Sequence, residues 1–121
     1  MEKKVIYYEN KGRKYVKEFI DELNDKIKGK VLARIEYVGQ HWHELGRPYI
    51  DYLEDGLYEI RIPFAHNQIR VLYAYMFRNY IVLLHVIKKK TKKVPENDKL
   101  RAEKRKIDFQ LRYNEGRIKL K

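Results

Sequence analysis

The sequence predicts an α+β fold, in which an N-terminal strand and a helical hairpin pack on a twisted, mainly antiparallel sheet that is followed by a C-terminal helix. Helix-spaced apolar residues recur between positions 14 and 45, and strand-like segments separated by short turns follow between 57 and 87. The 121 residues contain no internal repeat and no linker. A chain of this length fits one compact core, so we predict a single domain over residues 1–121.

One strand and two helices are predicted in the first part of the chain. Residues 4–9 (KVIYYE) are rich in the β-branched and aromatic residues that favour strands. Apolar residues then recur at spacings of three and four over 16–23 and over 27–45, with Asn24 and Asp25 between the two stretches. Two such amphipathic helices form a hairpin, and its apolar face requires another surface to cover it.

Three strands and a last helix are predicted in the remainder. Segments 57–64, 69–77 and 80–87 are joined by short turns and form an antiparallel meander. The third segment is apolar on both faces, so we place it inside the sheet. Pro95 begins the C-terminal helix, because proline is tolerated in a first helical turn. Residues 115–121 are expected to form a loose basic tail.

Positive charge is concentrated near the C-terminus. The net charge is +11, and residues 88–121 contain 14 Lys and Arg against 5 Asp and Glu. Such asymmetry indicates a polyanionic partner, either nucleic acid or an acidic protein segment. A helix with a solvated basic face would explain the charge alone equally well.

Several kinds of site and location are excluded by composition. No apolar run reaches the roughly 18 residues of a membrane span, and no signal peptide is recognisable, so no membrane association is expected. The absence of cysteine fits a cytoplasmic location. His41 and His43 are too close in sequence to share an ion, since positions i and i+2 of a helix project about 200° apart. We therefore expect no metal and no cofactor.

Two arginines are candidates for a phosphate site. If the first hairpin turns within its AHNQ segment, Arg61 and Arg70 lie opposite each other and project from the same face. The fork of a guanidinium matches a phosphate with two parallel hydrogen bonds, so a phosphodiester is a fitting ligand. The alternative is that each arginine pairs with a local carboxylate, such as Glu59 or Asp51.

His85 is a candidate for proton transfer. Pairing the second and third strands across their two-residue turn puts His85 opposite Leu72, with Arg70 and Tyr73 nearby. Nearby cations disfavour the imidazolium, so a lowered pKa is expected for His85. A histidine shifted in this way can exchange a proton with a ribose 2′-OH or with a leaving oxygen. The alternative is a hydrogen-bonded histidine of the core.

A lysine cluster follows His85 at the exit of the same strand. Lysines at the rim of a sheet hold the flanking phosphates of an RNA chain, and exposed tyrosine rings stack on its bases. Most of the 11 tyrosines are expected to belong to the core. The predicted RNA-binding residues are Lys88, Lys92, Lys93 and Tyr58.

Residues 49–109 resemble the RelE superfamily of toxins, specifically the HigB-like, phage-derived branch of type II toxin–antitoxin systems. The segments that carry the resemblance are LYEIRI, IRVLYAY, LLHVIKKKTKKVP and the helix that contains Ala102. In the family pattern a strand ends in a histidine or an aromatic residue, and two lysines, a threonine and a proline follow. Ile87 stands where an aromatic residue is usual. The matching positions are His85, Lys89, Lys90, Thr91 and Pro95.

This resemblance implies a metal-independent endoribonuclease that cleaves mRNA on the ribosome, an mRNA interferase. In such an enzyme the ribose 2′-OH attacks the scissile phosphate, and basic residues stabilise the charge of the transition state. The implied partners are mRNA on the ribosome and a cognate antitoxin of helix-turn-helix type. The alternatives are a non-catalytic RNA-binding module and a protein-interaction module with a basic sheet surface.

The resemblance also divides the candidate residues by role. Arg61 and Arg70 would bind and polarise the scissile phosphate. Lys89 and Lys90 would add positive charge around the transition state. The candidates for proton transfer are His85 and Tyr73.

Overall fold

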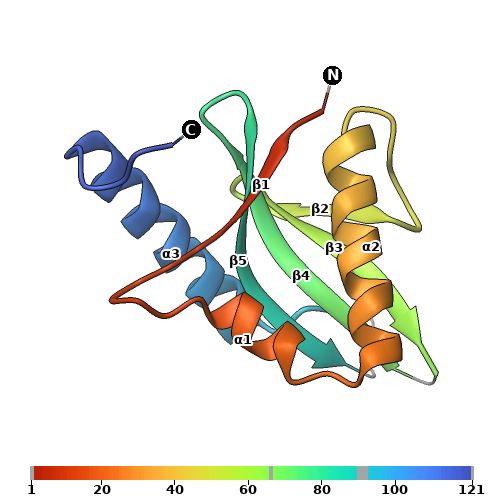
Figure 1. The fold of residues 1–121 in the computed structure, drawn as a ribbon. Coiled ribbons are helices and arrows are strands. Elements are labelled where there is room, and N and C mark those ends of the chain that lie inside the picture. Colours follow the sequence, from red (N-terminus) through yellow and green to blue (C-terminus); the bar gives the residue numbers. More distant parts are fainter. Residues whose placement is uncertain (1, 66, 90–92, 121) are drawn as a thin grey trace.

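Five strands and three helices make up the computed structural model, which describes residues 2–65, 67–89 and 93–120 (Figure 1). The predicted α+β class is confirmed. Among the described residues, no helix combines the length and the apolar character needed to cross a membrane. The elements in chain order are β1 (Lys4–Tyr7), α1 (Tyr15–Asp21), α2 (Asp25–His41), β2 (Ile50–Glu54), β3 (Leu57–Phe64), β4 (Asn67–Met76), β5 (Tyr80–Lys89) and α3 (Glu96–Asn114).

The five strands form one sheet in the order β1-β5-β4-β3-β2. β1 runs parallel to β5, and the other neighbours are antiparallel. The predicted registers are confirmed, since Arg61 pairs with Arg70 and Leu72 pairs with His85. β5 has a strand on each side, as its two apolar faces predict.

Strand β2 was not predicted, because its sequence IDYLE carries acidic residues and no clear alternation. It becomes a strand because β3 offers it a backbone partner: the Arg61 N–H donates to the Tyr49 carbonyl at 2.8 Å, and Ile50 pairs with Ile60. The preceding helix α2 ends at His41, before the predicted end at Leu45.

Helices cover both faces of the sheet (Figure 1). Each face has its own apolar core. On one face, Ile20 of α1 and Val31 and Ile35 of α2 pack in one cluster with strand residues such as Ile60. The opposite face is covered by α3, whose Ala102 and Phe109 belong to the second cluster. Because side chains alternate along a strand, the two helical layers contact different residues of the same strands.

Helix α3 turns a second set of apolar side chains outward. Leu100, Ile107 and Leu111 are 57%, 50% and 55% exposed, although they lie on the apolar stripe visible in the sequence. The segment after α3 is not the loose tail that was expected, because Ile118 and Leu120 are partly buried against the α3-side cluster. Ile118 and Leu120 therefore form part of a packed surface beside α3.

We predict that replacing Phe109 with alanine destabilises the protein strongly, because Phe109 anchors α3 in the core. Phe109→Ala should lower the free energy of unfolding by about 3–5 kcal/mol, as for other buried aromatic residues. Ile107→Ala is the matched control on the same helix and should change it by less than about 1 kcal/mol. Urea unfolding of both variants measures the difference, and equal losses would contradict the orientation of α3.

Candidate nucleic-acid interface

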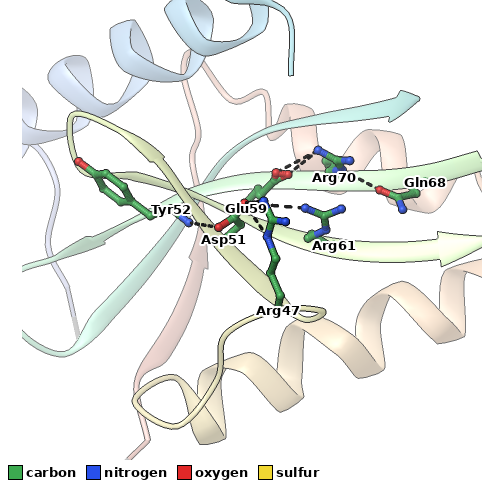
Figure 2. A network of polar contacts seen from close by, with 7 residues as sticks. All are labelled: Arg47, Asp51, Tyr52, Glu59, Arg61, Gln68 and Arg70. Carbon is green, nitrogen blue, oxygen red and sulfur yellow. Dashed lines mark hydrogen bonds and ion pairs between the residues drawn. The ribbon is translucent and has the colours of Figure 1, made fainter. Parts of the chain in front are cut away.

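Four charged residues from three neighbouring strands converge on the sheet face that α3 covers. The register places Asp51 of β2 beside Glu59 of β3, and Arg61 of β3 beside Arg70 of β4. Paired residues in an antiparallel sheet project from the same face, so all four side chains meet there. Figure 2 shows them together, with Arg70 directed at Glu59 and with Arg61 and Arg47 directed at Asp51.

Glu59 and Arg70 form an ion pair in the interior, with side chains that are 1% and 2% exposed. Nη1 of Arg70 donates to the two Glu59 oxygens at 2.6 Å and 3.1 Å, and its Nε donates to Gln68 Oε1 at 2.9 Å (Figure 2). Burial raises the pKa of Glu59, while the positive charge of Arg70 opposes that rise. Pairing with a local carboxylate, the alternative considered for the arginines, is thus what the structure contains.

Arg61 is held more loosely than Arg70. Its Nη1 lies 3.8 Å from Asp51 Oδ2, and its side chain is 19% exposed. Asp51 is bound more closely by Arg47, whose Nη2 donates to the same oxygen at 2.7 Å. That hydrogen bond is the main reason why the pKa of Asp51 is lowered. Because its contact with Asp51 is long, Arg61 retains N–H groups that can donate to a further acceptor.

These residues line a cavity of about 290 Å³ between β2, β3, β4 and the start of α3, which we call the basic cleft. Such a volume lies just below the range known for ligand sites, which begins at roughly 300 Å³. Lys99 closes one side, where its Nζ binds Glu54 at 2.9 Å and Glu96 at 3.2 Å. The lining side chains are Arg47, Asp51, Leu53, Glu59, Arg61, Arg70, Lys93, Val94, Glu96 and Lys99.

His85 lies on the same sheet face but binds α3 and does not line the basic cleft. Its Nε2 is 2.7 Å from Asp98 Oδ1, and its Nδ1 is 3.3 Å from Nη1 of Arg105. The predicted lowering of the His85 pKa is confirmed, and burial is its largest cause. The cations that contribute are Arg105 and Arg101 of α3, so the expectation that the strand arginines cause the shift was wrong. The imidazole is hydrogen-bonded in the manner of the core-histidine alternative.

Tyr73 and Tyr58 lie on the opposite face of the sheet from His85, so the expected closeness of Tyr73 to His85 is corrected. Consecutive residues of a strand project from opposite faces, and Leu72 already faces α3. Tyr73 is fully buried beneath the N-terminal helices, and its hydroxyl lies 3.2 Å from that of Tyr75. Tyr58 stacks on the Tyr73 ring, with centroids 5.6 Å apart. Neither ring lines the basic cleft.

The structure describes only some of the lysines that were predicted to bind RNA. Lys93 lines the basic cleft, and Lys88 is exposed with its Nζ 5.2 Å from the centre of the Phe64 ring. Lys90 and Lys92 lie outside the described residues, as does the side chain of Lys89. Within the described ranges, no group of three or more His, Asp and Glu side chains is arranged to hold a metal ion.

Glu59 is the site residue that sequence reasoning undervalued, since it was considered only as a possible partner of an arginine. Its signal is an acidic residue inside an apolar strand, where an ionised side chain is costly unless it is paired. Leu72 of β4 pairs with Glu59, and Arg70 lies two residues from Leu72 along β4, on the same face of the sheet. The diagonal between these positions is short enough for long side chains to meet.

The mainly antiparallel sheet, the helices on both of its faces and the C-terminal helix define a RelE-like α+β fold. The chain belongs to the Gp49-like family of phage-derived proteins: the family model described as "Phage derived protein Gp49-like (DUF891)" matches residues 18–106. This family is part of the toxin-like group that includes RelE. A comparison with curated proteins found no match.

We predict that Arg70→Met lowers the free energy of unfolding by about 3–5 kcal/mol at neutral pH, because it leaves the buried Glu59 carboxylate without its partner. The double variant Glu59→Leu/Arg70→Met removes both charges and should recover most of the loss. Urea unfolding of the two variants measures this. A double variant as unstable as Arg70→Met would contradict the explanation.

The destabilisation in Arg70→Met should also depend on pH. Without Arg70 the pKa of Glu59 rises further above its ordinary value of 4.5, so the folded protein takes up a proton at a higher pH than the unfolded chain does. The loss of stability should therefore be full above the raised pKa. It should shrink as the pH falls from there towards 4.5. Unfolding midpoints across this range test the sign, and a loss that grows towards acid would refute it.

Proposed function

We propose that the chain is the toxin of a type II toxin–antitoxin system and cleaves mRNA on the ribosome without a metal ion. The observation that carries the proposal is the basic cleft, which a member of a toxin-like family builds on one sheet face. Arg61 is partly exposed there and retains donors for phosphate oxygens. Arg47, Lys93 and Lys99 add positive charge around it. The predicted lysines Lys88, Lys89, Lys90 and Lys92 would follow the flanking phosphates.

In the proposed reaction the ribose 2′-OH attacks the scissile phosphorus, the 5′-oxygen leaves, and a cyclic phosphate remains. Glu59 accepts the 2′-OH proton, because its raised pKa makes it a stronger base than an ordinary carboxylate. Arg61 stabilises the charge that develops on the phosphate oxygens. The leaving oxygen takes its proton from solvent.

Arg70 has a different role in this proposal from the one that the resemblance implies. Both of its contacts are internal, and it is buried. We therefore treat Arg70 as the residue that positions Glu59, and Arg61 as the one that binds phosphate. His85 binds α3 outside the basic cleft, whereas Glu59 lines it, so Glu59 replaces His85 as the proposed general base.

A non-catalytic RNA-binding module is the second candidate. It is favoured by one observation, which is that His85 and Arg70 each bind two other residues of the protein. Such a module would bind RNA with a steep dependence on salt concentration and would leave the RNA intact. The two experiments that follow distinguish it from the nuclease.

We predict that Arg61→Gln abolishes toxicity without unfolding the protein, because the partly exposed guanidinium binds the scissile phosphate. Cleavage should fall by about 10²-fold or more, as for the loss of other groups that stabilise an oxyanion. The matched control is Arg13→Gln, an exposed arginine that pairs with Glu18 away from the cleft. The measurements are growth after induction and mapping of transcript ends within coding regions. Full toxicity of Arg61→Gln would refute the assignment.

We predict that Glu59→Gln prevents cleavage while RNA binding is kept, because glutamine preserves a hydrogen bond to Arg70 and removes the base. In the wild type, single-turnover cleavage should rise with pH until the raised pKa of Glu59 is passed and should then level off. Programmed ribosomes supply the substrate, and circular dichroism checks folding. Wild-type protein that binds RNA and never cleaves it would establish the RNA-binding module instead.

A further inference from the structure

Strand β1 leaves one edge of the sheet open. β1 is the outermost strand, and no described strand lies beyond it. The Lys4 N–H donates to the Asn79 carbonyl at 2.8 Å, and the Tyr8 N–H donates to the Leu83 carbonyl at 2.9 Å. Because backbone groups alternate in direction along a strand, the N–H and C=O groups of Val5 and Tyr7 point away from the sheet. An edge of this kind is a template for another strand.

Two hollows flank this edge, one on each face of the sheet, and both reach Val5 and Tyr7. The first has a volume of about 410 Å³ and is bordered by α2, where Leu32 is 42% exposed. The second has a volume of about 500 Å³ and is bordered by α3 and the segment after it. The apolar side chains that line them, besides those of β1, are Leu32, Ile35, Phe109, Ile118 and Leu120.

The two hollows fit the geometry of an added strand. Side chains of an extended segment alternate between the faces of a sheet, so successive residues would enter the α2 hollow and the α3 hollow in turn. The length of the free edge is limited at one end, where the Lys3 N–H donates to the Gly39 carbonyl at 2.9 Å. A short extended segment whose side chains enter the two hollows in turn therefore matches this edge.

The charge around the edge indicates the chemistry of the occupant. On the α3 side of the edge cationic side chains outnumber acidic ones, even when Asp108 and Glu115, which pair with Arg112 and Arg117, are counted. The whole chain carries a net charge of +11. A second copy of β1 would bring its own lysines into the same region, where like charges repel. The cations on the α3 side are Lys4, Lys14, Arg112, Arg117 and Lys119, against Glu9, Asp108 and Glu115, whereas the α2 hollow has Lys3 against Glu2 and Glu36.

We propose that the free edge of β1 binds an extended, acidic segment of a partner protein by strand addition. The backbone of the segment pairs with Val5 and Tyr7, its apolar side chains enter the α2 hollow, and its acidic side chains meet the cations on the α3 side. β1 and β2 are opposite edges of the sheet, and the basic cleft lies towards β2. The inference is therefore independent of the proposed nuclease and does not require the cleft to be active.

The test uses the full chain and a synthetic acidic peptide in which valine and glutamate alternate. We expect binding that perturbs the NMR signals of the Val5 and Tyr7 amides and slows their exchange with solvent. A peptide with lysine in place of glutamate should bind at least about tenfold more weakly, because it loses the charge complementarity. A peptide N-methylated on the amides that would face β1 should not bind, since it cannot complete the ladder.

Two protein variants make the test specific. Leu32→Glu puts a negative charge into the α2 hollow at an exposed position and should abolish binding of the acidic peptide. Leu100→Glu is the matched control, because Leu100 is also exposed but lies on α3 away from the two hollows.

Three outcomes would overturn the proposal. The first is no binding of the acidic peptide, and the second is binding whose perturbations lie at Arg61 and not at β1. The third is a dimer that sedimentation detects and that Leu32→Glu dissolves, which would identify a second copy as the occupant. Loss of toxicity in Arg61→Gln would leave the inference unaffected, so the two proposals fail separately.

Discussion

The buried ion pair between Glu59 and Arg70 constrains the centre of the sheet. Moving a carboxylate or a guanidinium out of water costs several kcal/mol even after relaxation, and only a close partner offsets that cost. The two residues meet because β3 and β4 pair in the register that sets Arg61 opposite Arg70. A shift of β3 against β4 by one residue would place the two charged side chains on opposite faces of the sheet. The ion pair therefore disfavours such a shift. The floor of the basic cleft depends on the same register.

The wall of the cleft depends on how α3 is attached. Buried Val94 precedes the helix, and Asp98 in its first turn binds His85 at 2.7 Å. Lys99 reaches across to Glu54 of β2 at 2.9 Å. These contacts hold the start of α3 over the strands. In this arrangement His85 links β5 to α3 through its contact with Asp98. Its lowered pKa follows mainly from that burial, so it is no evidence of a catalytic role by itself.

The electrostatics of the site separate two arginines that the sequence makes look equivalent. Arg70 is neutralised by Glu59 in the interior, whereas Arg61 shares Asp51 with Arg47 and keeps a longer contact. A protein with a net charge of +11 thus has acidic side chains at the centre of its cleft. They hold the cations in place before a ligand binds, and this lowers the cost of bringing several positive charges together. The cleft and the open β1 edge lie towards opposite edges of one sheet, so an anionic ligand and a partner segment would not compete for the same surface.

The sequence by itself determined the α+β class, the strands β3, β4 and β5, and the pairing of Arg61 with Arg70 and of Leu72 with His85. These features follow from local periodicity and from short turns, which leave few ways to pair neighbouring strands. Strand β2 was not predicted, because it becomes a strand by pairing with β3 and its own sequence has no clear alternation of apolar and polar residues. Only the tertiary structure decided that Tyr73 is buried on the face opposite α3 and that Arg70 forms an ion pair with Glu59. It also decided that three apolar residues of α3 face outward, namely Leu100, Ile107 and Leu111. Those outcomes depend on which face each helix covers and on which carboxylate lies nearest in space. These outcomes depend on contacts between residues that are distant along the chain, and the local sequence pattern does not predict such contacts.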